Sequence, residues 1–131
     1  MPPTLANIRV LVVEDHSDSR EVLSEMLQHV GAVVRPVAGA EEALPFLNDV
    51  DVIVTDFSMP GKDGVWLLDR IRASNRQVPV ILVSGFSARQ VSALAEAPFD
   101  LKLLKPIDPW DLAQEIVTLL RRQEEGQTTA A

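Results

Sequence analysis

Five short apolar runs lie along the chain, and each stops at a polar residue or a turn signal. The runs are rich in Val, Ile and Leu and contain few polar side chains, which is typical of parallel strands buried on both faces of a sheet. Pro36 cannot donate a ladder hydrogen bond, so its strand should lie at an edge of the sheet. We expect strands at residues 8–13, 33–37, 52–54, 78–83 and 101–104.

Segments with the apolar period of a helix alternate with these runs. Asp18 and Glu21 have the spacing of a capping box, and Gly31 is a helix-ending signal. Asp108 and Pro109 are suited to the cap and the first residue of the last helix. The other helices are expected at residues 40–47, shortened by Pro45, and at 65–73 and 87–97.

The alternation of strand and helix predicts an α/β fold with a doubly wound parallel sheet and helices on both of its faces. For five strands we expect the flavodoxin-like (βα)5 arrangement with strand order 2-1-3-4-5, which places Pro36 on an edge strand. The length of 131 residues fits one domain. We assign residues 1–6 to an N-terminal extension, 7–122 to the domain and 123–131 to a flexible C-terminal tail.

Composition excludes several classes of protein. Hydrophobic residues make up 47% and charged residues 24%, as in folded globular domains. The net charge of -7 argues against direct binding to nucleic acid. The chain has no cysteine, no apolar run long enough to span a membrane and no secretory signal at its start. We therefore expect a cytoplasmic protein that binds neither nucleic acid nor membrane.

Polar residues follow four of the predicted strands: Glu14 and Asp15, then Asp56, Ser84 and Lys105. Parallel strands bring these ends to one edge of the sheet, where open α/β folds place their chemistry. Each residue alone would be read as a solvated strand end. Together, the carboxylates would repel unless cations lay between them, and Mg²⁺ and Lys105 would supply that charge. The set predicts phosphoryl transfer onto a carboxylate.

The chain resembles a receiver domain of two-component response regulators over about residues 7–122. The resemblance rests on the order and the joint spacing of four short motifs. These are Val-Val-Glu14-Asp15, Asp56-Phe-Ser-Met-Pro-Gly-Lys-Asp-Gly64, Ser84-Gly85 and Lys105-Pro106.

The resemblance implies Asp56 as the phospho-acceptor. It also implies that Glu14, Asp15 and Asp56 hold Mg²⁺ as a cofactor, with the main-chain carbonyl of Ser58 as a further ligand. Lys105 would be the cationic contact to the phosphoryl group. These roles are expectations carried over position by position from the family's motifs.

Further expectations concern the residues around Lys105. The resemblance gives Ser84 a hydroxyl contact to the phosphoryl group and expects a cis bond between Lys105 and Pro106. The family's switch runs from Ser84 to a ring three residues before the lysine, where this chain has Lys102. We interpret Lys102 as a charge that opposes pairing at the edge of a short strand.

The resemblance implies a phospho-accepting signalling module of a two-component or phosphorelay system, which changes its affinity for a downstream partner protein. Its phosphodonor would be a histidine kinase or a histidine phosphotransfer protein. Such a module is no enzyme beyond catalysing its own phosphorylation and dephosphorylation. The chain would be a stand-alone receiver, or one excised from a hybrid histidine kinase or a longer regulator.

Two alternative functions compete with this one. A receiver-fold binding module that works without phosphorylation is the main alternative, and Lys102 is the residue that favours it. A hydrolase of the haloacid dehalogenase type needs a second aspartate two residues after its nucleophile, and that position is Ser58.

Overall fold

The computed structural model describes residues 4–57, 61–74, 77–85 and 96–130, the last five of these as backbone only. All five described strands join one parallel sheet in the order β2-β1-β3-β4-β5, which confirms the predicted flavodoxin-like arrangement. Pro36 lies on β2, an edge strand, as expected. The strands are β1 (Arg9–Val13), β2 (Val33–Val37), β3 (Val52–Asp56), β4 (Val80–Ser84) and β5 (Leu101–Leu104).

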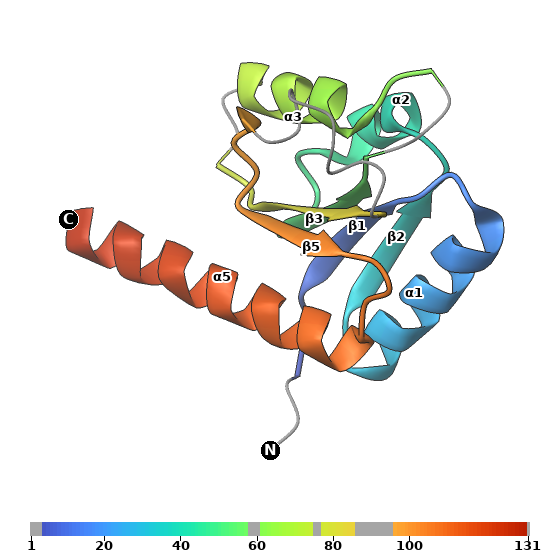
Figure 1. Ribbon diagram of the computed structural model, residues 1–131. Helices are drawn as coiled ribbons and strands as arrows, with labels where there is room; N and C mark the ends of the chain where they lie inside the picture. The colour runs from blue at the N-terminus through green and yellow to red at the C-terminus, as the bar shows by residue number, and fades with distance from the viewer. Residues whose placement is uncertain (1–3, 58–60, 75–76, 86–95, 131) are drawn as a thin grey trace.

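Helices cover both faces of this sheet, with α1 and α5 on one face and α2 and α3 on the other (Figure 1). Within the described residues, no helix combines the length and the apolar character needed to cross a membrane. The helix expected at 87–97 falls mainly on residues 86–95, which lie outside the described part of the chain. The described helices are α1 (Ser17–His29), α2 (Ala40–Ala43), which continues as a 3₁₀ turn (Leu44–Phe46), α3 (Gly64–Ala73) and α5 (Pro109–Ala130).

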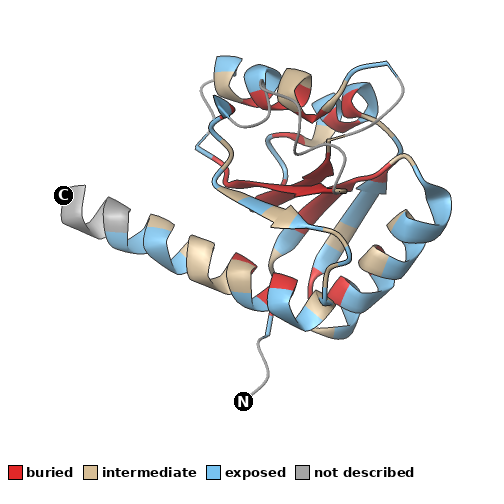
Figure 2. Cartoon of the chain, in the orientation of Figure 1, coloured by how far each residue is buried: buried red, intermediate tan, exposed pale blue. Residues whose placement is uncertain are grey.

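The core consists of two apolar layers, one on each face of the sheet. Along β1, Leu11 and Val13 enter the layer beneath α2 and α3, whereas Val10 and Val12 enter the layer beneath α1 and α5. Every residue of β3 and β4 is buried, and the edge strands β2 and β5 are largely exposed (Figure 2). Burial on both faces explains why the central strands are continuous apolar runs in the sequence.

The first helix begins differently from the prediction. His16, not Asp18, is the N-cap, and its ring nitrogen Nδ1 accepts a hydrogen bond from the amide of Ser19 at 3.5 Å. Asp18 lies inside the first turn, where a carboxylate still complements the helix dipole. The capping-box prediction was therefore wrong by two residues.

Described structure extends past both bounds that we predicted for the domain. The helix α5 runs to Ala130, whereas a flexible tail was predicted from residue 123. Residues 121–125 are Arg, Glu and Gln, which favour helix, and Gln123 Nε2 donates to the carbonyl of Gln77 at 2.8 Å. In the expected extension, Leu5 is fully buried and its amide donates to the carbonyl of Val30. The proposed domain boundaries themselves stay predictions.

Ser24 on α1 offers a test of packing against the sheet. Its side chain is 6% exposed, and its hydroxyl has no hydrogen-bond partner among the described residues. Because an unsatisfied buried hydroxyl and a modest helix propensity both cost free energy, Ser24→Ala should raise the free energy of unfolding by about 1 kcal/mol. Urea titration followed by circular dichroism measures this. The exposed Ser17→Ala variant should stay within about 0.5 kcal/mol of wild type; a destabilised Ser24→Ala variant would contradict the reasoning.

Candidate functional site

The register of the sheet brings Glu14 and Asp56 together. Val13 on β1 pairs with Thr55 on β3, so the next residue of each strand reaches the same edge of the sheet side by side. Glu14 is 5% exposed and Asp56 is 8% exposed. Two carboxylates are thus placed next to each other with little access to water.

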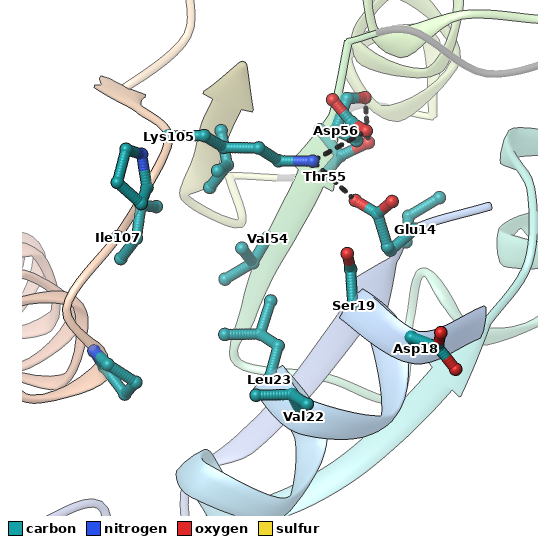
Figure 3. Close-up of a pocket in the computed structure, with 14 residues that line it drawn as sticks. Glu14, Asp18, Ser19, Val22, Leu23, Val54, Thr55, Asp56, Lys105 and Ile107 are labelled. Atoms are coloured by element: carbon teal, nitrogen blue, oxygen red, sulfur yellow. Dashed lines mark hydrogen bonds and ion pairs between the residues drawn. The ribbon is translucent and has the colours of Figure 1, made fainter. Parts of the chain in front are cut away.

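Lys105 lies directly after β5 and reaches across this edge. Its ammonium nitrogen Nζ is 3.1 Å from Oδ2 of Asp56 and 3.2 Å from Oε2 of Glu14, so one cation bridges both carboxylates (Figure 3). Its main-chain amide donates to the carbonyl of Ser84 at 2.8 Å, which fixes the start of the segment after β5. The Lys105–Pro106 bond is cis, as expected.

Contacts behind Asp56 fix its main chain. The hydroxyl of Thr55 donates to the carbonyl of Asp56 at 2.9 Å. On the other side, a Cβ atom at Gly64 would come within 2.9 Å of the same carbonyl oxygen. Asp63 caps α3 at that point by accepting the amide of Trp66 at 3.0 Å. A residue without a side chain is therefore needed where α3 begins.

Burial and charge shift two pKa values at the site. Burial, followed by the charge of Asp56, raises the pKa of Glu14 above its ordinary value, although Lys105 opposes the shift. For Lys105, burial alone would lower the pKa, but the hydrogen bond and the charge of Asp56, followed by those of Glu14, raise it overall. The ammonium between the two carboxylates is thus retained at neutral pH.

The acidic cluster fits the donor set of a magnesium site. Glu14, Asp15 and Asp56 each offer a carboxylate oxygen, and these three oxygens lie within 4.8 Å of one another. Mg²⁺ prefers such oxygen ligands and completes its octahedral shell with water. The fourth ligand expected from the sequence, the carbonyl of Ser58, lies outside the described residues.

The other two predicted site residues lie on the neighbouring strands β4 and β5. Ser84 is buried at the end of β4, and its carbonyl accepts the amide of Lys105. It does not line the cavity that contains Asp56, whereas the preceding residue Val83 does. Lys102 is exposed on β5 and pairs in register with Leu82 of β4. Their switch roles stay predictions.

A cavity of about 550 Å³ opens beside the cluster, between α1 and the start of α5 (Figure 3). Its floor carries the charged groups, and its walls are mainly apolar. Val22 has the apolar spacing of the first helix, yet it lines this cavity and is 56% exposed. The helix buries only a narrow stripe that includes Ser24 and Leu27. The apolar walls are formed by Val22, Leu23, Val54, Ile107 and the prolines 106 and 109.

Arg20 is a site residue that the sequence analysis missed. Its guanidinium nitrogen Nη1 donates to the carbonyl of Glu14 at 2.9 Å and to the carbonyl of Asp15 at 3.3 Å. The only signal in the sequence is an arginine in the first turn of the helix that follows an acidic pair. Arg20 contacts main-chain oxygens, which every residue possesses. The sequence therefore contains no particular type of partner residue from which this contact could be recognised.

Comparison with known proteins identifies the family to which this chain belongs. A family model described as the response regulator receiver domain matches residues 10–117. The chain is 30% identical to the chemotaxis protein CheY-3 of Vibrio cholerae, covering 88% of this chain and 94% of that protein. It is 36% identical to the response regulator protein FleR of Pseudomonas aeruginosa, covering 91% of this chain but only 25% of that regulator.

The fold agrees with solved structures as well. A CheY-like response regulator receiver domain protein from Methanospirillum hungatei superposes with a TM-score of 0.80 at 26% identity. The match covers 92% of this chain and 99% of that one. The similarity therefore extends over most of the chain.

The raised pKa of Glu14 gives a prediction on pH and stability. A group whose folded-state pKa is raised stabilises the fold while protonated, below its unfolded value of 4.5, and that contribution is lost as pH rises through the folded pKa. Gln cannot ionise. In metal-free buffer the advantage of Glu14→Gln over wild type should therefore grow as pH rises from 4 to 7, as measured by urea unfolding. An advantage that is constant with pH would contradict this, and the exposed Glu25→Gln variant is the control.

The close approach at Gly64 gives a second prediction for the site. In Gly64→Ala the new methyl group meets main-chain atoms of Asp56 and Phe57, so the free energy of unfolding should fall by about 1–3 kcal/mol. Chemical denaturation measures the loss. Gly85→Ala is the matched control, because a Cβ there has no atom within 4 Å. Equal stability of the two variants would show that the close approach at Gly64 does not destabilise the Gly64→Ala variant.

Proposed function

Since this chain belongs to the family of response regulator receiver domains, we propose that it is a phospho-accepting module of two-component or phosphorelay signalling. The observation that supports this best is the environment of Asp56. Its carboxylate lies at the end of a central strand, 3.1 Å from the ammonium of Lys105 and beside Glu14 and Asp15. The carboxylate also borders a cavity through which a donor can approach.

In the proposed reaction, a carboxylate oxygen of Asp56 attacks the phosphorus of a phosphohistidine on a histidine kinase or a histidine phosphotransfer protein. The new P–O bond forms as the P–N bond breaks, and the leaving imidazole nitrogen keeps the electron pair and takes up a proton. Water later hydrolyses the aspartyl phosphate, which restores Asp56 and releases inorganic phosphate. The chain would thus catalyse only its own phosphorylation and dephosphorylation.

The neighbouring residues stabilise the charge that develops on the phosphoryl oxygens. Lys105 is proposed to turn from Asp56 toward those oxygens, since its Nζ already lies within hydrogen-bond distance of the reacting carboxylate. Glu14, Asp15 and Asp56 would hold Mg²⁺, together with the carbonyl of Ser58, and the bound ion supplies further positive charge. The hydroxyl of Ser84 would donate to a phosphoryl oxygen.

The route of access supports a protein donor. The cavity beside Asp56 has apolar walls from α1 and from the segment before α5, and Val22 on its rim is largely exposed. An apolar rim around a charged floor suits a protein surface that presents a phosphohistidine. We propose that the donor's helix or loop covers this rim and excludes water during transfer.

The readout of phosphorylation is proposed to involve the surface near β5. Ser84 and Lys102 are the positions through which a change at Asp56 would reach the surface near β5 and so a downstream partner. Lys102 is exposed, so no buried ring can move at that position. The alternative of a receiver-fold binding module that works without phosphorylation draws its support from this residue.

Incubation with Mg²⁺ and a small acyl-phosphate donor tests the function directly. Intact-mass spectrometry should find one added phosphoryl group on the wild-type chain and none on Asp56→Asn, which lacks the nucleophilic carboxylate. The Asp18→Asn variant is the matched control, because Asp18 also lines the cavity but lies away from Lys105 (Figure 3). Addition to wild type should also stop when Mg²⁺ is chelated.

The negative outcome is equally informative. A wild-type chain that gains no phosphoryl group from either the small donor or a phosphorylated histidine phosphotransfer protein, while binding Mg²⁺, would favour the binding module. Addition to Asp56→Asn as well as to wild type would assign the acceptor to another residue.

A further inference from the structure

The turn between β1 and α1 positions the acidic pair with unequal support. The carboxylate of Glu14 is fixed from two sides, by Nζ of Lys105 at 3.2 Å and by the amide of His16 at 3.2 Å. The carboxylate of Asp15 is partly exposed and makes no hydrogen bond within the described part of the chain. The direction of the Asp15 side chain therefore depends on the main chain that carries it.

That main chain is held from α1 by a single side chain. Arg20 Nη1 donates to two consecutive carbonyls, those of Glu14 at 2.9 Å and Asp15 at 3.3 Å. The Glu14 carbonyl belongs to the planar peptide unit before the Cα atom of Asp15, and the Asp15 carbonyl belongs to the unit after it. Contacts to both carbonyls therefore hold the two peptide units between which the Asp15 side chain projects. Arg20 makes no ion pair among the described residues, so its hydrogen bonds are directed at this turn.

We propose that Arg20 is a positioning residue that holds Glu14 and Asp15 in the arrangement that binds Mg²⁺. The inference rests on the metal site of the proposed function. It assigns the ordering of that site to hydrogen bonds on main-chain oxygens, made before any metal is bound. Partners behind metal ligands commonly contribute in this way, by orienting the ligands without contacting the ion.

Replacement of Arg20 removes both its charge and its hydrogen bonds, and these two losses should change the affinity for Mg²⁺ in opposite directions. A guanidinium beside a cation site repels the dication, so removal of its charge alone should tighten Mg²⁺ binding. Loss of the two hydrogen bonds should loosen binding, because the ligands must then be ordered when the ion arrives. Lysine keeps the charge but has no planar fork of donors.

The experiment compares Arg20→Gln, Arg20→Lys and wild type by isothermal titration with Mg²⁺, with Arg121→Gln as an exposed control that removes the same charge from α5. Arg20→Gln should raise the dissociation constant about tenfold. Arg20→Lys should raise it by a smaller factor, and Arg121→Gln should leave it unchanged. In the metal-free proteins, hydrogen exchange of the His16 amide should be faster in both Arg20 variants, because that amide donates to Glu14.

Several results would overturn the inference. Unchanged or tighter Mg²⁺ binding by folded Arg20→Gln would show that charge, not positioning, is the role of Arg20. If that variant fails to fold, Arg20→Lys decides, and wild-type affinity in it would refute the role. A wild-type chain that binds no Mg²⁺ refutes it too. A chain that binds Mg²⁺ but accepts no phosphoryl group would refute the proposed function alone.

Discussion

The ammonium of Lys105 between Glu14 and Asp56 is the interaction on which the arrangement of the site depends. Each of these three residues follows or ends a different strand of the sheet, and the cation lies within 3.2 Å of both carboxylates. Burying two like charges side by side would be unfavourable without it. One side chain therefore makes an acidic cluster compatible with the carboxyl edge of a parallel sheet.

This arrangement of charges lowers the free energy of unfolding, and other parts of the fold compensate for that loss. The raised pKa of Glu14 means that its ionised form is disfavoured in the folded chain, even with Lys105 nearby. The two buried apolar layers on either side of the sheet provide the stability against which such a cost is tolerable. Sites that bind ions and transfer charged groups commonly have this character, because a cluster with all its charges satisfied would have little affinity for another cation.

The fold was predictable because its signals are local. Strands buried on both faces must be continuous apolar runs, and strict alternation with helices leaves few topologies for a five-stranded sheet. The errors lie where local signals compete or are absent. His16 replaced Asp18 as the cap of α1, and α5 continues past residue 122, where we expected the domain to end. Val22 fits the helical period, but the narrow contact of α1 with the sheet leaves it exposed.

The sequence by itself determined which residues end the strands, and therefore which chemical groups meet at one edge of the sheet. Their charges and their places in the chain are local properties. Only the tertiary structure decided how they are arranged. The contact between Lys105 and Glu14 joins residues 91 positions apart, and it depends on strand register and on the path of the segment after β5. The hold of Arg20 on the acidic turn is directed at main-chain carbonyls, which every residue possesses. No pattern of residue types can encode such a contact, so it becomes visible only when the helix is placed against the turn.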